Sequence, residues 1–328
     1  MKRQHLSNIL LIATLLISLA VLLDFCLVRG SCAAELSFSG KHQLRYTMNA
    51  GVRIIPFFWI NRNNVGGGKV SWSEEADGTK VLALLIGSDP ERVWRKINRW
   101  GYVMERVSGS TAELTGVMTQ SDEQSINQAK ASTAKSSKRY IFKGIRSRLE
   151  GAEAQSTTFR MDVSKNYTYK DVDILLGQFP VTGTSVRQLR IPTGTDSGFM
   201  FAVREMLHET VEKFKSIGKL TLPKPRQYVY SARLYSLSMP DSKIIKRLSV
   251  NGREYKQLIE SEFEAHNSAT SEVSHFVIAY GTDAPFSEVP IRIVYQPRWW
   301  FRAELLLDES AGIPLAAVLG SDLAENPW

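Results

Sequence analysis

The stretch Val289–Leu307, VPIRIVYQPRWWFRAELLL, decides the fold class of this chain. β-Branched and aromatic residues dominate it, and Gln296-Pro297 interrupts the run where a turn would fall. Val273–Tyr280, just upstream, has the same character and is followed by Asp283-Ala284-Pro285. Strands joined by short turns pair with their neighbours along the chain. This C-terminal region is therefore predicted to form an antiparallel meander, whose last strand is Trp299–Leu307.

Strand-like segments continue toward the N-terminus, separated by turn residues. Ala76-Asp77-Gly78-Thr79 and Asn251-Gly252 are hairpin signals, and Gly66–Gly68 predicts a bulge or a close strand crossing. The segment Glu254–Ala265 fits both the helical and the strand period, and we interpret it as a strand. The other predicted strands span 42–48, 52–60, 65–73, 80–86, 102–107, 111–118, 140–149, 157–163, 171–176, 227–237 and 244–250.

One long amphipathic helix is predicted over 198–217, because apolar residues repeat there at helical spacing. Asp196 or Ser197 can cap its start, and Gly218 can end it. We expect this helix to lie across a sheet and to bury its apolar stripe. The stripe consists of Phe199, Val203, Met206, Thr210, Phe214 and Ile217.

The clearest change in composition is at Thr119–Lys138, which is rich in Ser, Gln, Ala, Lys and Thr. Such a segment cannot bury enough apolar surface to fold alone. We interpret residues 119–138 as a flexible loop or linker between an N-terminal β region, 35–118, and a C-terminal β-rich region, 139–328. Whether it divides two domains or is inserted into one sheet stays open. The predicted fold class is mainly β, a curved or partly closed antiparallel sheet with the long helix packed on it.

Residues 1–34 have the pattern of a signal peptide. Lys2 and Arg3 precede an uncharged, Leu/Ile-rich run at Ile9–Leu23, and small residues up to Ala34 follow where a peptidase would cut. We therefore predict a cleaved signal and a periplasmic or secreted product.

Two other fates of this leader stay open. It could be retained as an N-terminal anchor, although Asp24 would be costly within a bilayer, or it could be lipid-modified at Cys32. Both cysteines, Cys26 and Cys32, lie in the leader. Cleavage would therefore leave a product without a disulfide or a thiolate metal site.

The charge of the chain is moderately positive, with 41 Lys+Arg against 33 Asp+Glu and a net charge of +8. Because the excess is spread over the chain rather than concentrated in a stripe, we expect no nucleic-acid partner. Contact with an anionic membrane surface is compatible with this charge.

The most ligand-like segment is Pro297–Arg302, in which Trp299, Trp300 and Arg302 lie close together. Side chains alternate along a strand, so the aromatic rings of this segment cannot all enter the core. A tryptophan beside an arginine suits a lipid headgroup, a sugar or a partner protein. Packing of these rings against the long helix is the alternative.

A second candidate lies at Arg99 and Trp100, at the end of a short helix predicted over Pro90–Trp100. Ser88-Asp89-Pro90 is a strong helix start. The basic face of this helix could grip an anionic headgroup or a glycan, or it could simply face water.

Catalytic and metal-binding patterns are weak throughout the sequence. Glu205, His208 and Glu212 share one helix, but the helical wheel places them opposite the apolar stripe, facing water. Asp171 and Asp173 would share one strand face, as a solvated face also would. No Gly-x-Ser-x-Gly elbow occurs. We predict no catalytic residues, no metal ligands and no cofactor.

Three C-terminal segments resemble an exported bacterial β-protein family known only as a periplasmic domain of unknown function. They are Val250–Tyr255, Val289–Tyr295 and Arg302–Leu305. The resemblance covers about the last third of the chain and implies an envelope β-fold without established catalysis.

Together these features predict a non-enzymatic exported envelope protein that binds an apolar or amphiphilic ligand, lipid-like or glycan, or an envelope partner on the concave face of its sheet. The alternative is a periplasmic hydrolase whose site is assembled from separated residues such as Asp196, His208 or His275.

Overall fold

The structure is a computed structural model. It describes residues 26–27, 35–36, 41–55, 58–93, 98–119, 140–163, 165, 167–178, 185–196, 198–270, 272–298 and 301–309. Most of the leader, most of the 119–138 segment, and Trp299 and Trp300 lie outside the described residues. Two short strands, β1 (Cys26–Leu27) and β2 (Glu35–Leu36), pair with each other.

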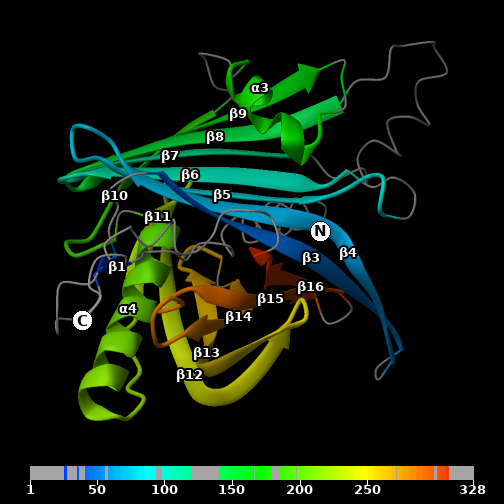
Figure 1. Cartoon of the computed structure of the whole chain (residues 1–328). Coiled ribbons are helices and arrows are strands. Elements are labelled where there is room, and N and C mark those ends of the chain that lie inside the picture. Colours follow the sequence, from blue (N-terminus) through cyan, green and yellow to red (C-terminus); the bar gives the residue numbers. More distant parts are fainter. Residues whose placement is uncertain are drawn as a thin grey trace.

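A single antiparallel sheet of 14 strands organises the described part of the chain (Figure 1). Its strands, in spatial order, are β10 (Ser185–Arg190), β9 (Glu153–Val163), β8 (Tyr140–Glu150), β7 (Thr111–Thr119), β6 (Trp100–Ser108), β5 (Lys80–Ser88), β4 (Phe58–Glu74), β3 (Lys41–Ile55), β16 (Phe301–Leu307), β15 (Pro290–Arg298), β14 (Val273–Gly281), β13 (Arg253–Asn267), β12 (Arg233–Val250) and β11 (Arg226–Tyr230). The mainly β class and the C-terminal meander are therefore confirmed.

The order of strands shows how the chain is wound. β3 lies in the middle of the sheet, between β4 and β16. From β3 the chain adds strands outward to β10, crosses through the helix α4 (Phe199–Ile217) to the opposite edge at β11, and returns to β16. β7 pairs directly with β8, so the strands on either side of the 119–138 segment are neighbours in one sheet.

The two edges of the sheet approach each other without closing. The segment after β10 joins them, because the Ile191 N–H donates to the Ala152 carbonyl (2.9 Å) and the Asp196 N–H donates to the Gln227 carbonyl (2.7 Å). Ala154, Ile191 and Val229 pack together at the same place. The sheet is therefore strongly curved, with its two halves facing each other in Figure 1.

The long helix predicted over 198–217 is confirmed, with observed bounds Phe199–Ile217. Its buried residues include Phe199, Val203, Met206 and Thr210 of the predicted stripe. The helix ends at Gly218, whose positive φ of 68° suits glycine. The predicted cap at Asp196 or Ser197 is not what begins the helix: the N-cap residue is Gly198, and it makes no side-chain capping bond.

The main core lies between the two halves of the sheet. Side chains from β3–β8 and from β11–β16 meet those of α4 in one buried cluster. Phe199, Phe263 and Phe276 lie at its centre, with Phe263 and Phe276 stacked at 4.8 Å between ring centroids. A second cluster covers the opposite face of β5–β9, beneath α3 (Val172–Leu176). Among the described residues, the concave side of the sheet is thus packed with core side chains and α4.

Several sequence predictions were wrong. The single strand predicted over 52–60 is instead the end of β3 and the start of β4, which pair antiparallel with Ile55 opposite Phe58. The strand predicted over 171–176 is the short 3₁₀ helix η2 (Tyr169–Asp171) followed by α3, because Thr168 and Asp171 form a capping box. The strand predicted over 227–237 is the hairpin β11–β12, which turns at Ser231 and Ala232 with φ of 55° and 45°. Turns with positive φ usually contain glycine, because other residues seldom adopt that conformation. This turn contains no glycine, so no residue in the sequence signalled it.

The helix predicted over Pro90–Trp100 was wrong at both ends, because Pro90–Arg92 form a turn and Trp100 begins β6. Its central residues, 94–97, lie outside the described residues. The hairpin predictions at Ala76–Thr79 and Asn251–Gly252, and the strand interpretation of Glu254–Ala265, are confirmed. Among the described residues, no helix is both long and apolar enough to cross a membrane.

Candidate functional site

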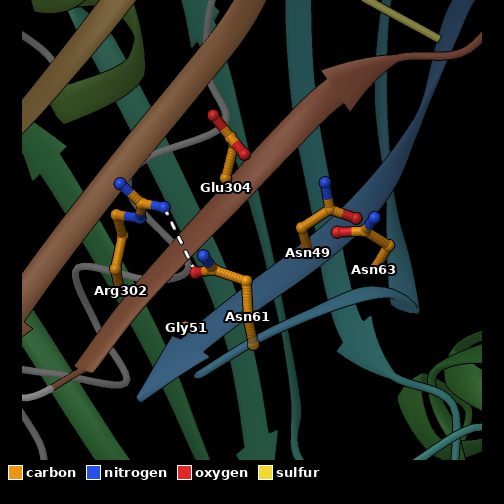
Figure 2. A pocket seen from close by; sticks show the side chains of 7 residues that line it. Asn49, Gly51, Asn61, Asn63, Arg302 and Glu304 are labelled. Atoms are coloured by element: carbon orange, nitrogen blue, oxygen red, sulfur yellow. Dashed lines mark hydrogen bonds between the residues drawn. The ribbon is translucent and has the colours of Figure 1, made fainter. Parts of the chain in front are cut away.

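A polar pocket of about 140 Å³ opens on the outer face of β3, β4 and β16. Figure 2 shows its side chains, with Arg302 on β16 reaching Asn61, and Asn49 and Asn63 side by side on the neighbouring strands. Arg302 and Glu304 alternate with Ala303 and Leu305, which are buried in the core. Strand alternation therefore turns the two charged side chains away from the core. The lining residues are Asn49, Ala50, Gly51, Asn61, Asn63, Arg302 and Glu304.

The sheet register brings these residues together. Arg302 pairs with Gly51 across β16 and β3, and Gly51 pairs with Asn61 across β3 and β4. Glu304 pairs with Asn49 one step along the same face. A register shift between Met48 and Ala50 accompanies this row of polar residues, which is the disruption that a β-bulge produces.

Gly51 keeps the floor of the pocket open. A Cβ atom at this position would lie 2.6 Å from Asn61 Oδ1 and 3.2 Å from Trp59 Cε3. The absence of a side chain lets the neighbouring polar groups converge above the backbone.

Trp59 and Asn61 position the guanidinium group of Arg302. Its Nη2 donates to Asn61 Oδ1 at 3.3 Å, and its Cζ lies 5.3 Å from the centroid of the Trp59 ring. Arg53 contacts the same ring, with its Cζ at 5.4 Å. Two cations thus gather around one indole, whose π face attracts positive charge.

Glu304 places an anion at the other end of the pocket. Its Oε1 lies 4.0 Å from Arg292 Nε. Arg292 donates from Nη2 to Glu260 Oε2 at 2.6 Å, and Lys243 Nζ lies 2.8 Å from Glu260 Oε1. Burial of Glu260 opposes its ionisation, but the hydrogen bonds and charges of Lys243 and Arg292 outweigh that effect and lower its pKa. The Glu304 end of the pocket therefore continues into a row of alternating charges, formed by Glu304, Arg292, Glu260 and Lys243.

The predicted ligand-binding residues are dispersed. Arg302 lines the pocket, whereas Trp299 and Trp300 lie outside the described residues. Trp100 is 4% exposed and donates its indole N–H to the Tyr167 carbonyl at 2.8 Å. The backbone N–H of Arg99 donates a hydrogen bond to Ser88 Oγ, 2.8 Å away. Binding by these residues stays a prediction.

The asparagines and Gly51 were missed by sequence reasoning. Their one local signal is the polar run Asn61–Asn64 inside a strand-like segment, since asparagine is depleted in strands. Nothing in the sequence pairs that run with Arg302, which is 241 residues from Asn61.

The helical wheel gave only part of the surroundings of one residue. His208 was predicted to face water, and 35% of its side chain is exposed, but its Nδ1 also lies 2.8 Å from Oε1 of the buried Glu288. His208, Glu212 and Glu288 form a group of potential metal ligands. The other residues of the hydrolase alternative have different partners: Asp196 pairs with Arg226 (3.0 Å) and His275 with Glu264 (3.4 Å).

Comparison with known proteins finds only distant likeness, at the level of solved structures. No protein-family profile matches the chain, and no curated protein matches it. Solved structures that resemble it include the crystal structure of a β-barrel-like protein of domain of unknown function DUF1849 from Brucella abortus. The identity is 8%, the match covers 82% of this chain and 96% of that chain, and the TM-score is 0.41. The likeness is therefore weak.

Proposed function

We propose that this chain is a non-enzymatic binding protein that takes a glycan residue in the pocket formed by β3, β4 and β16. The observation that carries the proposal is the convergence of Asn49, Asn61, Asn63, Arg302 and Glu304 above the glycine floor. Amide side chains both donate and accept hydrogen bonds, as the hydroxyl groups of a sugar do. Glu304 adds an acceptor, and Arg302 adds several donors in a fixed plane.

The size and charge of the pocket favour a sugar over the apolar ligand first expected. A volume of about 140 Å³ is small beside the ~300–1,000 Å³ of typical drug-sized sites, so it suits one ring of a longer chain. The carboxylate of Glu304 would repel a lipid phosphate group. Core side chains and α4 fill the concave side of the sheet. The outer face is therefore a better place for a ligand than the concave face.

The test is a binding measurement with defined sugars. Saturation-transfer NMR and calorimetry on the purified full chain would use glucose, N-acetylglucosamine, glucuronate and their short oligomers. Arg302→Ala and Asn61→Ala should each weaken binding about tenfold, since a lost hydrogen bond of ~1.4 kcal/mol corresponds to that factor. Gly51→Ala should weaken it too, because the new methyl group would occupy the floor.

Arg148→Ala is the matched control, because Arg148 lies exposed on β8 and pairs with Glu150. Binding that is absent from every sugar tested, or that is unchanged in Arg302→Ala and Asn61→Ala, would refute the proposal.

We further propose that the protein works in the periplasm or outside the cell. The support is the leader pattern of residues 1–34. N-terminal sequencing of protein recovered from the periplasmic fraction should begin at Glu35. Recovery of an intact Met1 from cytosolic protein would contradict export, and recovery of it from membranes would favour the retained anchor.

A further inference from the structure

A second group of polar side chains lies away from the pocket, between α4 and the segment that joins β14 to β15. His208 and Glu212 are four residues apart on α4, so they project from the same side of the helix. Glu288 reaches them from the β14–β15 connection, and its Oε1 is 2.8 Å from His208 Nδ1. One ligand atom from each residue lies within 4.8 Å of those of the other two.

Glu288 has an uncompensated oxygen atom. The residue is 2% exposed, and its Oε2 is buried without a hydrogen-bond partner. Buried carboxylate oxygens are rarely left without a proton donor or a cation, because their desolvation is costly. Oε2 of Glu288 is therefore available to bind a cation.

The backbone holds Glu288 in this position. Its φ is 64°, a conformation that non-glycine residues seldom adopt. The Glu288 N–H donates to the Gly281 carbonyl at 2.8 Å, and the Gly281 N–H donates to the Val289 carbonyl at 3.1 Å. The carboxylate is thus presented to the helix by a fixed turn rather than by a free loop, and strained backbone of this kind is common at functional sites.

We propose that His208, Glu212 and Glu288 bind a divalent first-row transition metal. An imidazole with two carboxylates suits such ions, whereas Mg²⁺ and Ca²⁺ prefer oxygen ligands alone. Three protein ligands would leave a coordination position for water. Two ligands bonded at ~2.1 Å to a tetrahedral ion are about 3.4 Å apart, so His208 Nδ1 and Glu288 Oε1, now 2.8 Å apart, would separate slightly to admit the metal, and ligand atoms farther apart than that would move inward.

The surrounding charges modulate the site. Glu205 adds negative potential near His208. Arg204 acts on Glu288 electrostatically, and Lys215 Nζ lies 3.5 Å from Glu212 Oε1 and 3.0 Å from Ser287 Oγ. Lys215 belongs to the last turn of the helix and can swing into solvent when a metal replaces it at Glu212.

The experiment uses the untagged full chain with ZnCl₂ at pH 7.5. Calorimetry and elemental analysis after dialysis should give one Zn²⁺ per chain. His208→Ala, Glu212→Gln and Glu288→Gln should each weaken binding at least tenfold. Co²⁺ bound to the wild-type chain should show visible d–d absorption that these variants lose.

Two controls separate this site from adventitious binding. Glu209→Gln changes a carboxylate on the same helix that pairs with Lys213 instead, and it should bind Zn²⁺ as the wild-type chain does. Cys26→Ser with Cys32→Ser removes the two thiols and should also leave binding unchanged.

The proposal is overturned if the wild-type chain takes up no Zn²⁺, if the cysteine variant abolishes uptake, or if His208→Ala and Glu212→Gln bind like the wild-type chain. Should Glu288→Gln fail to fold, Glu212→Gln still decides the question, because Glu212 is only half-buried. Sugar binding at the β3–β4–β16 pocket is measured separately, so failure of either proposal leaves the other standing.

Discussion

The carboxylate of Glu105 on β6 caps α4 by accepting a hydrogen bond from the backbone N–H of Met200. The two Glu105 oxygens lie 3.1 and 3.2 Å from Met200 N, and Oε2 also accepts from the Phe201 N–H at 3.3 Å. The first N–H groups of a helix have no acceptor within the helix. Here Glu105, a strand residue, supplies that acceptor. A Cβ atom at Gly198 would lie 2.3 Å from Glu105 Cδ, which explains a glycine at the N-cap.

This cap makes the stability of the protein depend on pH. Burial raises the pKa of Glu105 to about 7, although the N–H donors of Met200, Phe201 and Phe199 act to lower it. A carboxyl group whose pKa is higher in the folded state stabilises the fold fully below its unfolded pKa and loses that contribution as the pH rises through about 7. The free energy of unfolding should therefore fall between about pH 4.5 and pH 7.5.

Glu105→Gln should remove that pH dependence. The amide oxygen can still accept from the helix N–H groups but cannot ionise. In urea unfolding, the variant should be more stable than the wild-type chain at pH 8, by up to about 3 kcal/mol, and the difference should shrink at pH 5. Equal pH profiles for the two proteins would show that Glu105 does not titrate in this range.

Gly66→Ala should destabilise the sheet severely. A Cβ atom at Gly66 would lie 2.0 Å from the Gly87 carbonyl oxygen and 2.7 Å from Met48 Cε. Backbone cannot move aside as a flexible side chain can, so we expect a loss of more than about 3 kcal/mol, or failure to fold.

Gly177→Ala is its matched control, because Gly177 has helical backbone angles and the nearest atom to its Cβ would be 3.6 Å away. Thermal unfolding of the two variants checks the contrast. Similar melting temperatures would mean that β4 and β5 are farther apart at Gly66 than the structure indicates.

Arg292→Met should destabilise the protein by about 1–3 kcal/mol at pH 7, because Glu260 would keep only Lys243 as a cationic partner. The pKa of Glu260 is lowered in the folded state, so its ionic contribution is present above the unfolded pKa and is lost as the pH falls through the folded pKa. The difference from the wild-type chain should therefore diminish in acid.

Arg247→Ala serves as the comparison, since its pairing with Glu254 is exposed and should contribute little. Chemical denaturation at pH 7 and pH 3 measures both effects. A loss that is the same at the two pH values would exclude the charge of Glu260 as its cause.

Phe276→Ala should cost about 3–5 kcal/mol. Phe276 stacks on Phe263 at 4.8 Å and meets the edge of Phe199 at 5.7 Å, so it joins α4 to β13 and β14. Val186→Ala, at a position that is 60% exposed on β10, should change stability by less than about 0.5 kcal/mol. Equal unfolding midpoints for these variants would place the folding core elsewhere.

Local patterns predicted much of the fold. Turn pairs such as Asn251-Gly252 fixed hairpins, and the apolar stripe beginning at Phe199 located α4 at its observed bounds. The failures occurred where local chemistry was ambiguous. Tertiary packing turned the chain at Ser231 without a glycine, and the capping box at Thr168 redirected a segment that could otherwise have been a strand.

The candidate sites were less predictable. Arg302 was anticipated from its aromatic neighbours, but its asparagine partner Asn61 lies 241 residues away. His208 is partly exposed and also pairs with a buried glutamate. The helical wheel could not show this partner, because a wheel built from one helix takes no account of the Glu288 turn that packs beside it.

The sequence by itself determined the β-rich class, most strand positions and the long helix, because these follow from side-chain periodicity and turn residues close together in the chain. Only the tertiary structure decided the pairing of β16 with β3, the filled concave side, the pocket over Gly51 and the meeting of His208 with Glu288. These features depend on contacts between residues far apart in sequence, and such contacts exist only after the sheet has curved and packed against α4.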